Sequence, residues 1–215
     1  MEAGETLDHE PRSTVCTKKK WRDRLIALAL GHPEWVLGFQ DEVWWSRLAQ
    51  PNLHTWTAAK PLRLIQNEPD RPDPEPKARA CYGLLRTDTQ AMLLRFVNGR
   101  PVSAVTTQFL GWLTARLAAE GKTALLMVWD NASWHVSQAV RAWLKAHNHR
   151  VKRDGGCRVV VCPLPIKSPW LNRIEPKWVH GKRAIAEPDR KLGVDELQHR
   201  ICAYYNCELL EPIAK

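Results

Sequence analysis

The sequence feature that most constrains the fold is an apolar run that ends in one aspartate. Leu125 to Trp129 are five successive apolar residues, and Asp130 follows them directly. An unbroken apolar run of this length is typical of a strand that is buried on both faces of a sheet. In mixed α/β sheets, ligands bind at the carboxyl ends of such strands. Asp130 is therefore a candidate for chemistry.

The rest of the chain predicts strands and helices around that run. Strands are expected at Glu34–Trp45, Leu53–Ala58 and Cys157–Leu164, with a strand or hairpin at Ala80–Val97. Helices are expected at Trp21–Leu30, between Pro101 and Gly121, and at Val136–Ala146, Asn172–Ala186 and Asp195–Leu210. Early hairpins followed by β-α-β units predict an α/β fold, a mixed sheet covered by helices on both faces. The first strand is expected to pair antiparallel with the second and parallel with the strand that ends at Asp130.

Net charge and apolar content limit which classes of partner the protein is expected to bind. The 215 residues carry a net charge of +9. The stretch from Arg150 to Lys191 contains eleven Lys or Arg residues and only four Asp or Glu residues. Such an excess favours a polyanionic partner, although a solvated face is the ordinary explanation of a charge run. No apolar run approaches the ~20 residues that span a bilayer, and the N-terminus lacks the apolar region of a secretory signal. We therefore expect a cytoplasmic protein with no membrane partner.

Two further acids are predicted to join Asp130. Asp41 lies near the C-terminal end of the first strand and is followed by Glu42. Side chains of a strand alternate between its faces, and Asp41, which shares a face with Phe39, is taken as the inward one. Pro176 is tolerated only in the first turn of a helix, so Glu175 is expected at a helix N-terminus, where the helix dipole stabilises an anion.

Each acid also has a plain structural explanation. Asp130 could cap a turn with Asn131, Asp41 could be an exposed strand end, and Asn172 has capping-box spacing to Glu175. Three carboxylates that converge on one sheet edge, however, repel one another and require a raised pKa or a cation. Hard oxygen ligands suit Mg²⁺ or Mn²⁺, and two such ions ~4 Å apart serve phosphoryl transfer. Without metal, Asp130→Asn is then expected to raise thermal stability, because it removes one repelling charge.

Three blocks of sequence resemble the DDE transposases. They are FQDE at 39–42, WDNASWH at 129–135 and SPWLNRIEPKW at 168–178. The chain is most similar to the six-thirty family of bacterial insertion sequences, relatives of the mariner elements, over roughly Glu34 to Leu210. The patterns D-N-x-x-x-H and S-P-x-L-N-x-I-E-x-x-W are specific, whereas F-x-D-E is weak by itself.

The resemblance implies a ribonuclease H-like fold with a mixed five-stranded sheet. It implies Asp41, Asp130 and Glu175 as catalytic ligands of Mg²⁺ or Mn²⁺, with two ions expected. It also implies that double-stranded DNA is cleaved at transposon ends and that the freed ends are joined to target DNA. Roles in positioning the acids or the DNA are assigned to Asn131, His135 and Asn172. Contacts with DNA phosphates are expected from Lys167, Lys177, Lys182 and Arg183.

The domain organisation follows from the same resemblance. Residues 1–20 are interpreted as a polar tail or linker, and residues 21–215 as the catalytic domain. Transposases of this kind carry helix-turn-helix modules before that domain, and the roughly thirty residues before the first strand are too few for one. The recognition module is therefore expected either to be a separate subunit or to be lost. The resemblance further implies a homodimer and a nucleoid-associated bacterial location.

The spacing of the acids departs from the family pattern, and two alternative functions stay open. The second and third acids stand roughly ten residues further apart than in mariner-type enzymes, and the extra length is attributed to the stretch His147 to Gly156. One alternative is a ribonuclease H-like nuclease without a joining step. The other is an inactive, element-derived DNA-binding protein, against which the three intact acids argue.

Overall fold

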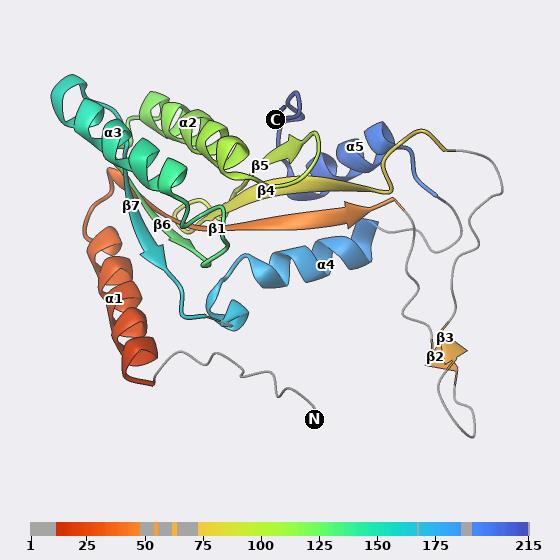
Figure 1. Cartoon of the computed structure of the whole chain (residues 1–215), viewed down its shortest axis with the longest axis horizontal. Coiled ribbons are helices and arrows are strands. Elements are labelled where there is room, and N and C mark those ends of the chain that lie inside the picture. Colours follow the sequence, from red (N-terminus) through yellow and green to blue (C-terminus); the bar gives the residue numbers. More distant parts are fainter. Residues whose placement is uncertain are drawn as a thin grey trace, which may run out of the picture.

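A five-stranded mixed sheet forms the centre of the molecule in the order β5-β4-β1-β6-β7 (Figure 1). The computed structural model describes residues 12–47, 54–55, 62–63, 73–166, 168–185 and 191–214. The sheet strands are β1 (Trp35–Ser46), β4 (Ala78–Arg86), β5 (Met92–Val97), β6 (Ala124–Trp129) and β7 (Arg158–Pro163). Strand β1 pairs antiparallel with β4 and parallel with β6, and β6 pairs parallel with β7. The predicted mixed sheet is confirmed.

Helices cover both faces of this sheet. They are α1 (Arg12–Leu30), α2 (Ser103–Ala119), α3 (Gln138–Asp154), α4 (Glu175–Ile185) and α5 (Val194–Tyr205), with a short 3-10 helix η1 at Pro169–Leu171. Helices α2 and α3 lie on one face, and α1 and α4 on the other (Figure 1). Within the described residues, no helix is long and apolar enough to cross a membrane.

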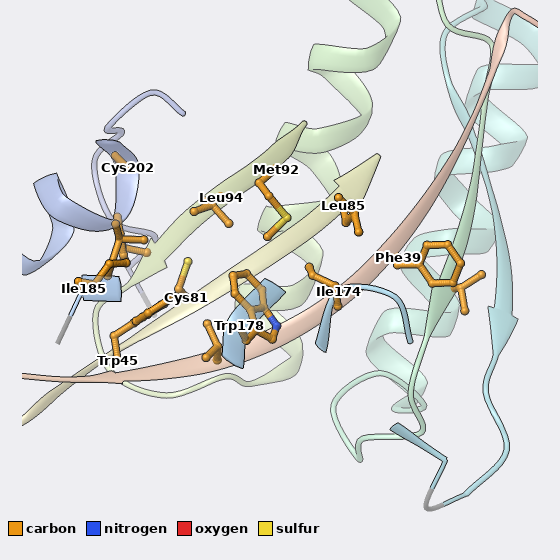
Figure 2. Packing of buried hydrophobic residues seen from close by; sticks show 14 of the residues in the cluster. Phe39, Trp45, Cys81, Leu85, Met92, Leu94, Ile174, Trp178, Ile185 and Cys202 are labelled. Carbon is orange, nitrogen blue, oxygen red and sulfur yellow. The ribbon is translucent and has the colours of Figure 1, made fainter. Parts of the chain in front are cut away.

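The alternation of β1 divides the core in two. Phe39 and Val43 belong to one apolar cluster with residues of α1, α4 and α5, part of which Figure 2 shows. Val36 belongs to a second cluster with the buried face of α2, which includes Phe109 and Leu113. Odd-numbered residues of β1 therefore face α4, and even-numbered residues face α2 and α3. This division decides on which side each acid of β1 lies.

The antiparallel partner of β1 was predicted wrongly. Within the expected strand Leu53–Ala58, only His54–Thr55 (β2) is described as a strand, and it pairs with Leu62–Arg63 (β3) in a separate two-stranded sheet. The remaining residues of that prediction lie outside the described residues. The partner of β1 is β4, whose run from Ala80 to Arg86 is buried throughout. Burial on both sheet faces favours this apolar strand over a short polar one.

Helices α1 and α3 extend beyond their predicted bounds. Helix α1 begins at Arg12, so residues 12–20 are helical rather than part of a polar tail. Helix α3 runs on to Asp154 and takes up most of the stretch interpreted as extra length. There His147 is buried, stacks on Trp143 and bonds the carbonyl of Cys157 at 2.9 Å. In α3, residues with reasonable helix propensity and the buried side chain of His147 extend the helix beyond its apolar pattern.

Gly83 of β4 provides the close approach of α4 to the sheet. It lies opposite Asp41 in the β1–β4 register. A Cβ atom added to Gly83 would overlap the indole ring of Trp178 and come within 3.2 Å of Ile174. Trp178 is buried in the core cluster that α4 shares with β1 (Figure 2). The missing side chain therefore sets how close α4 sits to Asp41.

Substituting Gly83→Ala should displace Trp178 and lower the free energy of unfolding by ~2 kcal/mol, the usual scale of overpacking. Urea denaturation measures the effect. The matched control is Gly111→Ala in α2, where the nearest atom to an added Cβ is 3.8 Å away and no clash occurs. That control should be neutral or stabilising by up to ~1 kcal/mol. Equal effects at the two positions would contradict the close packing of Trp178 on Gly83.

Candidate active site

The pairing of β1 with β6 brings Asp41 and Asp130 to the same edge of the sheet. The last parallel pair between the two strands is Phe39 with Val128. Each aspartate lies two residues beyond its member of that pair. Neighbouring strands are ~4.8 Å apart, so the two residues leave the parallel ladder side by side.

Asp41 lies on the α4 face of β1, as its odd number predicts. Its Oδ2 atom accepts a hydrogen bond of 3.0 Å from the indole Nε1–H of Trp178. Trp178 is only 3% exposed, so its position is fixed by core packing. The bond orients the Asp41 carboxylate toward the N-terminal half of α4.

Glu175 is the first residue of α4, and Asn172 fixes this end of the helix. The Asn172 side chain does not form the predicted capping box. Its Nδ2–H group donates instead to the backbone carbonyl of Gln40 on β1, at 3.0 Å. The Glu175 N–H bonds the backbone carbonyl of Asn172 at 3.2 Å. A buried Asn172, 2% exposed, thus ties the start of α4 to β1 beside Asp41.

The pKa values show that the three acids interact. Burial, followed by the charges of Glu175, Glu42 and Asp130, raises the pKa of Asp41 to about 8. Burial and the Asp130 carboxylate raise the pKa of Glu175, against the opposing effect of Lys182. Perturbed acids of this kind concentrate at functional sites.

A groove lies between Asp130 and Glu175. Its volume is about 290 Å³. Its wall also includes Asn131, Ala132, Leu164, Pro165, Ile166, Ser168, Pro169 and Asn172. The Asn131 side chain donates from Nδ2 to the carbonyl of Leu164, which joins the loop after β6 to the loop after β7. Asn131 therefore holds the two walls of the groove together.

His135 connects Asp130 with the acid that was expected to point away from the site. Its Nδ1 atom lies 2.8 Å from Oδ1 of Asp130, and its Nε2 atom lies 2.8 Å from Oε1 of Glu42. Burial acts to lower the pKa of His135, but the bonds to Asp130 and Glu42 outweigh it and raise the pKa to about 9. The ring is therefore an imidazolium at neutral pH and donates to both carboxylates. With its side chain fully buried, His135 cannot itself contact DNA.

Asp130 consequently differs from the other two acids. Burial acts to raise its pKa, but the hydrogen bonds from His135 and from the N–H of Ala132 outweigh burial and lower it. The bond with His135 argues against the expectation that Asp130→Asn would raise thermal stability, because this carboxylate is held by hydrogen bonds that favour its ionised form. Asp41 is the acid whose ionised form the surroundings disfavour.

The predicted DNA-binding residues are mostly on α4. Lys177, Lys182 and Arg183 are exposed on this helix, whose first residue is Glu175. Lys167 lies outside the described residues. The sequence predicted that Trp178 flanks the acids, but it did not predict the hydrogen bond from Trp178 to Asp41. It also missed Glu42 as a partner of His135. The alternation of β1 places Glu42 on the α3 side, but only the fold brings His135 to meet it.

The donor chemistry of the three acids fits a hard divalent cation. All three are carboxylates, and burial with mutual repulsion disfavours the ionised forms of Asp41 and Glu175. A cation removes that cost. Within the described part of the chain, no three His, Cys, Asp or Glu side chains are close enough to share one ion. Sharing one ion among all three carboxylates therefore requires their side chains to move together.

The sequence places the chain among known enzymes. Residues 78–198, more than half of the chain, match the DDE superfamily endonucleases. The chain belongs to this family. The matched region contains Asp130 and Glu175, and Asp41 precedes it. No curated protein matches the chain.

Solved structures of a transposase share the fold. The Mos1 transposase paired-end complex with left transposon end has a TM-score of 0.62 and 16% identity, over 97% of this chain and 59% of that one. The Mos1 mariner paired-end complex with Mn gives 0.61 and 15%, over 97% and 60%. The catalytic domain of Mos1 mariner transposase gives 0.58 and 15%, over 93% and 85%. The chain thus spans about three fifths of the first two proteins, and its predicted ribonuclease H-like fold is confirmed.

Two substitutions should have opposite effects on the stability of the metal-free protein. Asp41→Asn should raise the free energy of unfolding at pH 8 by at least ~1 kcal/mol, because it removes a carboxylate that resists ionisation. Asp130→Asn should lower the melting temperature, because it loses the charged bond with His135. Thermal unfolding in EDTA measures both effects.

The pH dependence provides the control for these two variants. Asp41 keeps its proton in the folded state up to about pH 8, whereas in the unfolded state it ionises near pH ~4. The folded state therefore binds more protons between these values, and its stability falls as pH rises through them. Asp41→Asn should remove this part of the slope. If stability depends on pH in the same way in Asp41→Asn as in wild type, Asp41 does not have the raised pKa.

Proposed function

We propose that this chain is the catalytic domain of a transposase of the six-thirty group, which cleaves DNA at transposon ends and joins the ends to target DNA. The observation that carries this proposal is that three acids gather at one edge of the sheet: the β1–β6 register brings Asp41 beside Asp130, and Asp130 and Glu175 line one groove. Membership in the DDE superfamily endonucleases supports it. The Mos1 structures support a transposase rather than a nuclease of another kind.

The reaction is proposed to depend on Mg²⁺ or Mn²⁺, held by Asp41, Asp130 and Glu175. Mos1 structures were solved with either metal. Two such ions supply charge stabilisation for the attacking and leaving oxygens of an in-line phosphoryl transfer. The protein contributes the placement of the acids: Trp178 orients Asp41, Asn172 anchors the helix of Glu175, and His135 holds Asp130.

Double-stranded DNA is the proposed partner. Exposed Lys177, Lys182 and Arg183 lie on the helix that begins at Glu175, so DNA bound there would reach the acids. Such side chains contact phosphates and carry little sequence information. Two copies of the chain are proposed to bring two DNA ends together, as a paired-end complex does in Mos1. The recognition subunit and the bacterial cytoplasmic location stay predictions from the sequence.

A joining assay tests the catalytic proposal. The chain is incubated with Mn²⁺, a pre-cleaved end that carries a free 3′-hydroxyl, and a supercoiled target plasmid. Wild type should produce joined products, and Glu175→Gln should reduce them at least ~1,000-fold, because one metal ligand is lost. The matched control is Asp154→Asn, an exposed acid at the end of α3, which should join ends like wild type.

The same assay separates the alternatives. Cleavage without joining would favour the ribonuclease H-like nuclease. DNA binding with neither reaction would favour an inactive, element-derived protein. Wild-type joining by Glu175→Gln would contradict the assignment of the acid.

A salt titration tests the DNA surface. Lys182→Gln/Arg183→Gln should weaken binding to a DNA duplex and reduce the slope of log affinity against log salt by about 2, roughly one unit for each lost phosphate contact. The control is Lys152→Gln/Arg153→Gln, a Lys-Arg pair in the last turn of α3, which should leave both quantities unchanged. Equal losses in the two variants would show that the basic charge acts only through the net charge of the chain.

A further inference from the structure

A chain of hydrogen bonds crosses from the centre of the sheet to Asp130. It begins at Gln40 of β1, whose Nε2–H donates to Oε1 of Glu42 at 2.9 Å. The same oxygen accepts from Nε2 of His135, and Nδ1 of His135 donates to Oδ1 of Asp130. Glu42 and His135 are buried, with side chains 7% and 0% exposed, whereas the Asp130 side chain is 52% exposed. This series of hydrogen bonds thus runs from the interior of the protein to the groove.

Asp130 needs support of this kind because the sheet does not hold it. Strand β6 ends at Trp129, and Asp130 begins the loop that leads to α3. An exposed carboxylate at such a place can rotate between several rotamers. Here Oδ1 receives two bonds, one from His135 and one of 2.9 Å from the Ala132 N–H. Across the described residues, no hydrogen bond occupies Oδ2.

His135 is itself held firmly. Its ring stacks on Trp129 with a centroid distance of 4.4 Å and an interplanar angle of 9°. Glu42 bonds the nitrogen on the far side of the ring. Trp129 thus fixes the plane of the ring, and Glu42 fixes its rotation within that plane.

We propose that Glu42, acting through His135, is a positioning residue that holds Asp130 Oδ1 and presents Oδ2 to the metal. This inference rests on the proposed metal-dependent function of the three acids. It gives a role to the second acid of the Asp41-Glu42 pair. Asp41 acts on the α4 face of β1, and Glu42 supports Asp130 from the opposite face. Outer partners of metal ligands typically contribute 10- to 100-fold to metal affinity.

The chain offers a matched control on the same strand. Glu34, directly before β1, bonds Nδ1 of His32 at 3.0 Å, so it forms a second carboxylate–histidine pair. Both of those side chains are 42% exposed, and the pair lies at the opposite end of β1 from the acids. Glu34→Ala therefore removes the same type of bond without touching Asp130.

Calorimetric titration with Mn²⁺ is the first arm of the test. Glu42→Ala should weaken Mn²⁺ binding about 10-fold. Glu42→Gln should lie between Glu42→Ala and wild type, because its amide oxygen still accepts one bond from His135. Glu34→Ala should stay within about twofold of wild type. Equal affinities for Glu42→Ala and wild type would overturn the proposal.

The second arm uses no metal. In protein labelled with ¹⁵N-histidine, the Nδ1–H proton of His135 reports the bond to Asp130. Asp130→Asn assigns this signal, and Glu42→Ala should shift it or broaden it away, while Glu34→Ala should leave it in place. An unchanged signal in a folded Glu42→Ala variant would show that Glu42 does not hold Asp130.

The two arms separate this inference from the function on which it rests. No Mn²⁺ binding by the unaltered chain would overturn the proposed function, and the signal of His135 would still decide whether Glu42 positions Asp130. If Glu42→Ala does not fold, Glu42→Gln decides in both arms. It must then weaken Mn²⁺ binding and move the signal, or the proposal fails.

Discussion

The parallel pairing of β1 with β6 is the constraint on which the candidate site depends. It brings two strands that lie far apart in the sequence into contact and ends their shared ladder at Phe39 and Val128. Asp41, within β1, and Asp130, directly after β6, therefore lie side by side. The acids are not placed by flexible loops alone. Their backbone positions follow from the register of a buried apolar ladder, so a shift of one residue in β1 would move Asp41 to the opposite face.

The three acids are held in different electrostatic states. The imidazolium of His135 compensates the charge of Asp130, whereas burial and neighbouring carboxylates oppose ionisation of Asp41. A sheet that served stability alone would gain nothing from burying Asp41 in this way. An electrostatically unfavourable group within a fold that is otherwise well packed is typical of functional sites. In this account, the cost of ionising Asp41 is what a divalent cation relieves.

Local rules of backbone chemistry predicted much of this site. Pro176 placed Glu175 at the start of a helix, and the alternation of β1 placed Asp41 on the face of that helix. The apolar run before Asp130 predicted a buried strand, which β6 confirms. Each of these inferences needed only neighbouring residues, and for that reason they succeeded.

The predictions that failed depended on contacts between residues that lie far apart in the sequence. Strands β1 and β4 are separated in the sequence by residues 47–77, and the prediction paired β1 with the nearer candidate strand instead. The bond between His135 and Glu42 spans 93 positions of sequence. Alternation along β1 alone predicts that Glu42 faces away from the site. The fold places the loop after β6 across the other face, where Glu42 meets His135.

Diffraction from crystals soaked in Mn²⁺ tests the central claim most directly, because anomalous scattering locates the ion. We expect an anomalous peak where Asp41 meets the groove, with carboxylate oxygens of Asp41, Asp130 and Glu175 drawn to coordination distance, ~2.1 Å for a hard divalent cation. We further expect that Asp130 binds through Oδ2, with Oδ1 still bonded to His135. A peak that lacks Asp41 or Glu175 among its ligands, or no peak in the groove, would contradict the account.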